Sequence, residues 1–241
     1  MAPYPLTDDQ ITSYHRDGWV LLPGLIERAH AQLLRMEILG IMDIIGLPPT
    51  CLRQTGEFLR GGHLHRFVHD VAIRDLASRL IGGPAHLYGP FTAVKSPGGG
   101  PMHFHQDNQY TPHDGPSINL WTAMEPIDAV NGCMRMVSGS HLQGTLPSVA
   151  SEENHRRLDG LPESFTPLPM QPGDCVAFSR LTLHASGPNQ TTLPRVAYAV
   201  QYHREDVRAR WDERGWVPLI ERPRWTFGPV DRISCPDGPG E

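Results

Sequence analysis

The stretch Met102–Tyr110, "MHFHQDNQY", places two histidines and an aspartate at a spacing of two residues. In a β-strand, alternate side chains point to the same face of the sheet. If this stretch is extended, three of its side chains share one face: His103, His105 and Asp107. Phe104 and Gln106 then point to the other face. Because neighbouring imidazole and carboxylate groups can hold one metal ion, the stretch predicts a strand that carries metal ligands.

Short apolar runs separated by Gly and Pro continue from about residue 84 to residue 204. Seven runs have the length and the apolar or aromatic content of strands. They cover residues 86–96, 102–107, 117–127, 133–139, 174–180, 181–186 and 195–203. Seven strands of this kind predict a sandwich or barrel. The polar, Pro-rich segment 140–170 is expected to be a long functional loop, with at most a short helix at 151–158.

The first 83 residues have the character of helices instead. Thr7 is a candidate N-cap for a first helix, and Gly18 is its expected end. A short strand is expected next, at residues 19–24. Two helices are expected after it, at residues 25–46 and 68–81. We therefore expect one domain over residues 1–241, with parts at 1–83 (helical support), 84–204 (β core) and 205–241 (extension).

The composition is that of a globular protein: of 241 residues, 39% are hydrophobic and 20% are charged. The formal charge of −5 comes without a long run of either sign, which argues against nucleic acid as a partner. No stretch approaches the ~20 apolar residues of a membrane span. Because the first residues lack the pattern of a secretory leader, the cytoplasm is the expected location. Nothing in the sequence specifies an oligomeric state.

A facial iron site needs a second imidazole beside the pair His105 and Asp107. His184 is the candidate, because it lies near the end of the strand-like run 181–186. A hydrogen-bonded histidine of the core is the alternative interpretation of His184.

Arg195 is the candidate for binding an anion. It opens the run 195–203, on a face that it shares with small or polar side chains, Ala197, Ala199 and Gln201. A guanidinium there can bind a carboxylate through two parallel hydrogen bonds, and the Ser186 hydroxyl can add a third. A surface arginine in a salt bridge is the alternative interpretation.

Five segments, in this order along the chain, resemble the phytanoyl-CoA dioxygenase family of iron(II)/2-oxoglutarate oxygenases. The first is "LTDDQITSYHRDGWVLLPGLI" at residues 6–26, followed by "HQD" at 105–107 and "LWTAMEPIDAVNGCMRMVSGSH" at 120–141. The others are "PGDCVAF" at 172–178 and "HASGPNQTTLPR" at 184–195. The resemblance implies a mainly β fold with flanking helices, a double-stranded β-helix (jelly roll, cupin-like).

The resemblance also implies roles for single residues. His105, Asp107 and His184 match the facial triad that holds iron in the family. Arg195 matches the arginine that binds the far carboxylate of 2-oxoglutarate, and Ser186 matches its hydroxyl partner. Trp121 matches a tryptophan that lines the cosubstrate pocket, and Asn119 is a further candidate on the same strand face.

The implied activity is that of a dioxygenase with Fe(II), 2-oxoglutarate and O₂ as its cofactors. Such an enzyme hydroxylates, or otherwise oxidises, an unactivated C–H bond, with succinate and CO₂ as coproducts. The expected substrate is a small-molecule metabolite, for instance from secondary metabolism. Desaturation, cyclisation and epimerisation are other outcomes of the same chemistry.

Two other functions remain open from the residues alone. One is a cupin-type metalloenzyme that needs no 2-oxoglutarate, and the other is a non-enzymatic metal-binding or ligand-binding sandwich. Several residues have no assigned role: Lys95, Arg53, Arg60, His63, His65 and His103. The region 52–67 is expected to cover the pocket mouth, with His63 and His65 as solvated loop histidines. For His103 we favour a half-exposed imidazole over a substrate contact.

Overall fold

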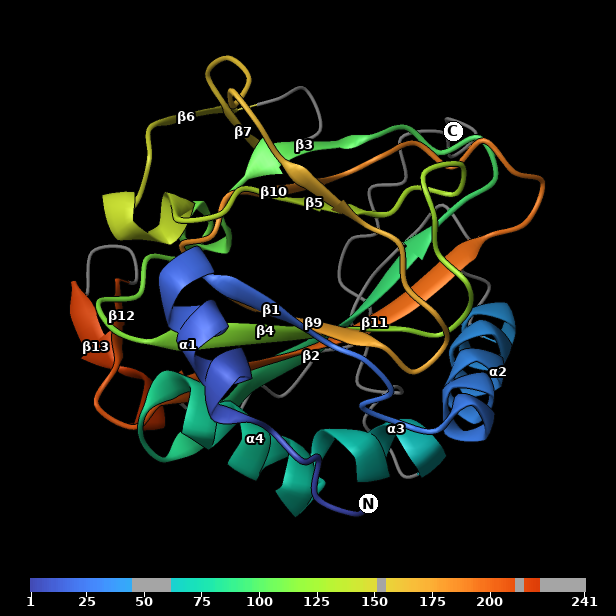
Figure 1. Cartoon of the computed structure of the whole chain (residues 1–241), viewed down its shortest axis with the longest axis horizontal. Helices are drawn as coiled ribbons and strands as arrows, with labels where there is room; N and C mark the ends of the chain where they lie inside the picture. The colour runs from blue at the N-terminus through green and yellow to red at the C-terminus, as the bar shows by residue number, and fades with distance from the viewer. Residues whose placement is uncertain (45–61, 151–154, 211–214, 222–241) are drawn as a thin grey trace.

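Two β-sheets face each other in the computed structural model, which describes residues 1–44, 62–150, 155–210 and 215–221 (Figure 1). The five-stranded sheet has the order β1 (Trp19–Leu22), β9 (Cys175–Ser179), β4 (Ser117–Ala123), β11 (Arg195–Arg204) and β2 (Ala85–Lys95). The four-stranded sheet has the order β3 (Met102–His105), β10 (His184–Ser186), β5 (Met134–Met136) and β8 (Thr166–Leu168). All these pairings are antiparallel. The predicted fold, a double-stranded β-helix with flanking helices, is confirmed.

Each of the seven predicted strand runs forms a strand, in chain order β2, β3, β4, β5, β9, β10 and β11. The segment 140–170 differs from the expectation. It contains a 3₁₀ turn at Ser140–Gln143, the paired strands β6 (Ser148–Ala150) and β7 (Arg156–Leu158), and β8. The helix expected at 151–158 is therefore wrong for its last three residues, which form β7. Leu158 instead packs on the cluster of Phe104, Leu183 and Ala185, which gives the hairpin an apolar surface to cover.

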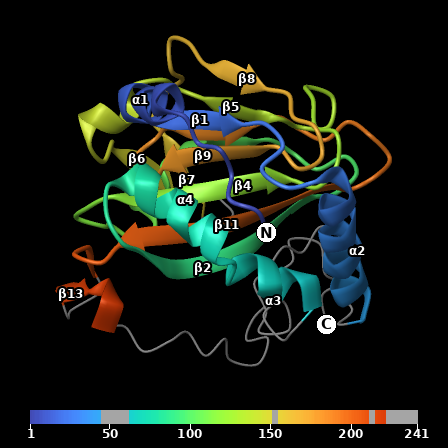
Figure 2. The same cartoon turned by 60° about the horizontal axis from the view of Figure 1, so that its bottom comes forward.

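The helices cover the outer face of the five-stranded sheet (Figure 2). Helix α1 (Asp8–Asp17) begins at Thr7, whose hydroxyl accepts a hydrogen bond from the Gln10 amide, and it ends at Gly18 with φ +81°, as predicted. Helix α2 (Arg28–Ile44) also lies in its predicted region.

The helix predicted at 68–81 is α4 (Val71–Ile81), which begins three residues later than expected, and a further helix that was not predicted, α3 (Gly62–Val68), precedes it. They are separated at Asp70, whose carboxylate caps α4 by accepting from the Ala72 amide.

Strand β11 contributes to two apolar layers. Val196, Tyr198 and Val200 point to the helices, where they pack in the larger cluster. Ala197 and Ala199 point between the two sheets. The alternation of faces predicted for this strand is confirmed, and the small side chains on the inner face leave room for a cavity.

The chain beyond β11 forms a further pair of strands, β12 (Arg208–Arg210) and β13 (Trp216–Pro218), followed by a 3₁₀ turn at Leu219–Glu221. Cys133 and Cys175 are buried free thiols. None of the helices in the described ranges is long and apolar enough to cross a membrane. The arrangement as one domain with an extension at 205–241 stays a prediction.

Candidate metal centre

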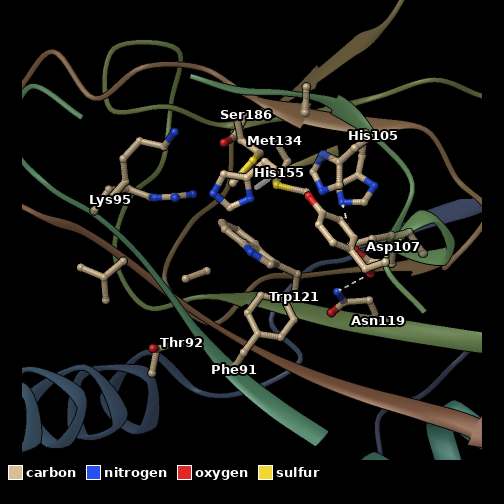
Figure 3. Close-up of a pocket in the computed structure, with 18 residues that line it drawn as sticks. Phe91, Thr92, Lys95, His105, Asp107, Asn119, Trp121, Met134, His155 and Ser186 are labelled. Atoms are coloured by element: carbon tan, nitrogen blue, oxygen red, sulfur yellow. Dashed lines mark hydrogen bonds and ion pairs between the residues drawn. The ribbon is translucent and has the colours of Figure 1, made fainter. Parts of the chain in front are cut away.

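The pairing of β3 with β10 brings the two histidines of the predicted triad together. His105 is the direct partner of His184 in the register, and their ring centroids lie 4.3 Å apart. Asp107 follows β3 at the start of a 3₁₀ turn (Asp107–Gln109), and its Oδ1 lies 3.8 Å from Nε2 of His184. One ligand atom from each of the three side chains lies within 4.8 Å of the others. Figure 3 shows two of them, His105 and Asp107, on the same side of the cavity. Residues far apart in the sequence thus offer two imidazoles and one carboxylate at one point.

The expectation that His103 shares the face of His105 is wrong. On β10 the step from His184 to Ser186 spans two residues, whereas on β3 the step from His105 to Met102 spans three. This β-bulge places one extra residue on β3 and shifts the alternation of its side chains. Met102 therefore lines the cavity, and the His103 side chain is exposed, which agrees with the role of an ordinary surface imidazole rather than a substrate contact.

Both ligand rings are oriented by backbone carbonyls. Nδ1 of His105 donates to the carbonyl of His103 at 2.7 Å, and Nδ1 of His184 donates to the carbonyl of Thr182 at 2.9 Å. Because a carbonyl can only accept, each Nδ1 carries the proton and each Nε2 has its lone pair free. A neutral imidazole with a free Nε2 is the form that binds a metal ion.

The electrostatics favour the metal-binding protonation states. Burial lowers the pKa of His105 to about 4, and the neighbouring His184 adds to this effect. Burial opposes the ionisation of Asp107, but the electrostatic and hydrogen-bonding effects of nearby groups outweigh burial and hold its pKa below the usual value. Those groups include His184, Arg180, His105 and the Asn119 amide. The site thus keeps a neutral His105 and a charged carboxylate at neutral pH.

Arg195 lies at the other end of the same cavity, only 5% exposed. Its Cζ sits 5.2 Å from the ring centroid of Trp121, and its Nη1 lies 3.5 Å from the carbonyl oxygen of Gly132. Its Nε has no hydrogen-bond partner among the residues that the structure describes. Burial lowers the pKa of Arg195 to about 10, and the group remains a cation at neutral pH. Ser186, also 5% exposed, lines the cavity as well.

Lys95 adds a second cation to this end of the cavity. It is the direct partner of Arg195 in the pairing of β2 with β11, and its Nζ donates to the carbonyl of Gly100 at 2.7 Å. Burial lowers the pKa of Lys95 to about 8, and the positive charges of Arg195 and Arg135 lower it further. No described carboxylate forms an ion pair with Lys95 or with Arg195; Glu125, which attracts Arg195 at longer range, pairs with Arg35. A buried cation such as Arg195 is costly without an anion.

The cavity has a volume of about 710 Å³ and lies between the two sheets. It brings together all seven residues predicted for the site: His105, Asp107, Asn119, Trp121, His184, Ser186 and Arg195. Asn119 lies beside Asp107, with its amide nitrogen 3.2 Å from Oδ2 of the carboxylate.

Sequence reasoning missed several walls of the cavity: Phe91, Met102, Tyr110, Met134, His155 and Phe178. Phe91 shares the strand face of Lys95, and a period of two could have found it. His155 comes from the segment that was expected to be a loop, where no local pattern identifies it.

The region 52–67 does not behave as expected in the part that the structure describes. Residues 62–67 belong to α3, which packs against α2, and none of them lines the cavity. His63 and His65 are therefore helix residues rather than loop residues. Arg53 and Arg60, which were expected to lie near the pocket mouth, are outside the described residues.

The chain belongs to the phytanoyl-CoA dioxygenase (PhyH) family, because the model of that family matches residues 53–197. It is therefore a 2-oxoglutarate-dependent oxygenase, whose cofactors are iron, 2-oxoglutarate and O₂. Membership of this family decides against the cupin-type enzyme without 2-oxoglutarate and against the non-enzymatic sandwich.

The chain is similar to a curated relative in sequence and to two solved structures in fold. A methylphosphonate hydroxylase of Gimesia maris is 29% identical over 215 residues, which cover 82% of this chain and 81% of the relative. The carbocyclase SnoK from nogalamycin biosynthesis has a similar fold, with a TM-score of 0.72 at 22% identity over 85% of this chain and 86% of SnoK. The epimerase SnoN, solved with Fe³⁺, α-ketoglutarate and nogalamycin RO, has a TM-score of 0.70 at 19% identity over 94% and 93%.

The residues in the cavity fit these cofactors. Two neutral imidazoles and one carboxylate are the donor set of a non-haem iron site with open positions. A buried arginine without a carboxylate partner fits the carboxylate of a cosubstrate that enters the cavity.

We predict that His184→Ala abolishes metal binding, because it leaves only one imidazole and one carboxylate. Wild-type protein purified without oxygen should bind about one Fe(II) per chain, as measured by equilibrium dialysis and metal analysis. His103→Ala is the matched control, since His103 lies outside the cavity, and it should bind iron like the wild type. Undiminished iron binding by His184→Ala would remove this residue from the site.

Proposed function

We propose that the protein hydroxylates an unactivated C–H bond of a small-molecule metabolite and forms succinate and CO₂ as coproducts. His105, Asp107 and His184 would hold the iron, and Arg195 with Ser186 would bind the far carboxylate of 2-oxoglutarate. One observation carries the proposal: a single cavity contains the three candidate ligands at one end and a buried arginine without a described carboxylate partner at the other.

Each wall residue has a defined task in this proposal. Trp121 supports the guanidinium of Arg195 through its ring face, so that the fork of N–H donors points into the cavity. The hydroxyl of Ser186, whose strand also carries His184, adds a donor for the same carboxylate. The aromatic walls Phe91 and Phe178 exclude water from the space between the two ends.

When bound, iron and 2-oxoglutarate would activate O₂ for the oxidation of the substrate C–H bond. The chain itself contributes position and charge. The carbonyls of His103 and Thr182 keep the two imidazoles in the ligand tautomer, and the buried carboxylate of Asp107 remains ionised. A small substrate would lie between the metal end and the outer walls formed by Tyr110 and His155.

Charge favours an anionic substrate. Arg195 and Lys95 bring two positive charges to the cosubstrate end. The far carboxylate of 2-oxoglutarate carries one negative charge and would neutralise only one of them. The remaining charge favours a second anion in the cavity. The similarity to a methylphosphonate hydroxylase supports the same class, a small organic anion such as a phosphonate or a carboxylate.

We predict that Arg195→Ala weakens 2-oxoglutarate binding by roughly 2 to 5 kcal/mol, or some tens to thousands of fold, because the far carboxylate loses its bidentate partner. Ser186→Ala removes one charge-assisted hydrogen bond and should cost less, about 1.5 to 3 kcal/mol. The measurement is an anaerobic titration of Fe(II)-loaded protein with 2-oxoglutarate, followed by the charge-transfer absorption of the chelated keto acid.

Arg16→Ala is the control for the loss of a positive charge, because Arg16 is an exposed residue of α1 that pairs with Asp17 and does not line the cavity. It should change the affinity for 2-oxoglutarate by less than about threefold. Fe(II) binding should stay nearly intact in all three variants. An Arg195→Ala protein that titrates like the wild type would contradict the proposed role.

We also predict that 2-oxoglutarate binding weakens as the pH rises through about 8. Lys95 is a cation below this pH and neutral above it, and its positive charge lies next to Arg195. The wild-type dissociation constant should rise about three- to tenfold between pH 7 and pH 9. Lys95→Met should start from the weaker affinity and show no such rise. The same pH dependence in both proteins would assign the titration to another group.

The reaction outcome is tested with a panel of one- to three-carbon phosphonates and carboxylates, with methylphosphonate first. We predict that at least one of them stimulates succinate formation from 2-oxoglutarate. Under ¹⁸O₂, hydroxylation places one labelled oxygen atom in the product and the other in succinate. An oxidised product without label would indicate desaturation or cyclisation, and a lack of stimulation by every compound would contradict a small organic anion as the substrate.

A further inference from the structure

The carboxylate of Asp107 is held by two amides from the five-stranded sheet. Nδ2 of Asn119 donates to Oδ2 of Asp107 at 3.2 Å, and Nε2 of Gln201 donates to the same oxygen at 3.1 Å. Asn119 on β4 and Gln201 on β11 are direct partners in the strand register. Figure 3 shows the contact of Asn119 with Asp107 at the edge of the cavity. Two adjacent strands therefore present a pair of donors to a single carboxylate oxygen.

The two oxygens of Asp107 consequently have different surroundings. Oδ2 is occupied by both amides, whereas Oδ1 is the atom that faces Nε2 of His184 at 3.8 Å. Arg180 fixes the backbone of the same turn, because its Nη2 donates to the carbonyls of Asp107 and Thr111 at 2.9 and 3.1 Å. Neither the turn nor the carboxylate can rotate without the loss of these hydrogen bonds.

The polar character of Asn119 has a cost that packing alone does not explain. The residue is only 1% exposed, and its Oδ1 is buried without a hydrogen-bond partner among the residues that the structure describes. A buried acceptor that lacks a partner is destabilising, and an apolar side chain of the same shape would avoid this cost. The amide also cannot reverse its ends, because its NH₂ group donates to a carboxylate. The donor function toward Asp107 is thus what the amide contributes here.

We propose that Asn119 and Gln201 are positioning residues that keep Asp107 bound to the metal through one oxygen. With Oδ2 held by the two amides, Oδ1 is the oxygen that remains for the iron. The second oxygen is thereby kept from occupying a coordination position that 2-oxoglutarate or O₂ requires. This inference rests on the proposed metal site, and it gives Gln201 a role that the sequence analysis did not predict.

The test uses two nearly isosteric substitutions, Asn119→Leu and Gln201→Met, which remove the donors and keep the volume. Co(II) is the probe, because it binds the same donor set and is stable in air. Each variant should bind Co(II) about 10- to 100-fold more weakly than the wild type, which is the usual effect of the loss of a hydrogen bond to a metal ligand. At saturating Co(II), the visible absorption spectrum should also change, because the freed second oxygen can reach the metal.

Thr122→Val is the matched control. Thr122 lies on β4, is fully buried and faces the helices rather than Asp107, so its substitution should leave Co(II) affinity and spectrum like those of the wild type. Thermal melting of the metal-free proteins separates positioning from general stability. If Asn119→Leu and Gln201→Met only lower the melting temperature and bind Co(II) with wild-type affinity and spectrum, the proposal is wrong. If Asn119→Leu does not fold, Gln201→Met decides alone, because a methionine has the length of a glutamine.

The result can be separated from a failure of the metal site itself. Should the wild type fail to bind Co(II), or should His184→Ala bind it unchanged, the proposed ligand set is wrong. A second outcome is that the wild type binds Co(II), His184→Ala loses it, and both Asn119→Leu and Gln201→Met match the wild type. In that case only the positioning role is wrong. Weaker Co(II) binding together with an altered spectrum in Asn119→Leu and Gln201→Met supports both the ligand set and the positioning role.

Discussion

The antiparallel pairing of β3 with β10 is the interaction on which the candidate site depends. It sets His105 opposite His184 and brings Asp107, two residues later, to the same point. The bulge in this pair decides which side chain of β3 lines the cavity. Because of the bulge, Met102 rather than His103 points into the cavity beside Ser186. Without the extra residue, strict alternation would place an imidazole next to the proposed carboxylate site.

The cavity combines opposite charges that are too far apart to pair with each other. Asp107 lies at one end, and Arg195 and Lys95 lie at the other. Each charge is held by neighbours that are not counter-ions: two amides for Asp107, the ring of Trp121 for Arg195, and the carbonyl of Gly100 for Lys95. Buried charges held in this way destabilise the protein until an ion of the opposite sign binds. The large apolar layers on both faces of the five-stranded sheet offset this cost.

The fold does not choose the outcome of the reaction. Structures with the same fold include one described as a carbocyclase and one described as an epimerase. The differences must therefore come from the walls around the substrate rather than from the scaffold. In this chain the walls outside the five segments that resemble the family include Phe91, Tyr110 and His155. Tyr110 also connects the metal end to the β6–β7 hairpin, because its hydroxyl accepts a hydrogen bond from the Arg156 amide.

The sequence by itself determined the features that depend on neighbouring residues. The alternation of β11 placed Arg195 on the inner face with Ala197 and Ala199, and Thr7 and Gly18 marked the ends of the first helix, because such patterns act over a few residues. The segments that resemble the family, in their order along the chain, identified six of the seven residues that the cavity brings together, and the strand face shared with Trp121 identified Asn119.

Only the tertiary structure decided how those residues meet. The bulge in β3 depends on its pairing with β10. The hydrogen bonds from Asn119 and Gln201 to Asp107 depend on the register of β4 with β11. His155 reaches the cavity because β7 lies beside β3. Each of these contacts joins segments that are distant in the sequence. A strand shows which of its faces is apolar, but the partner that it will pair with, and in which register, is set by the packing of the whole sheet.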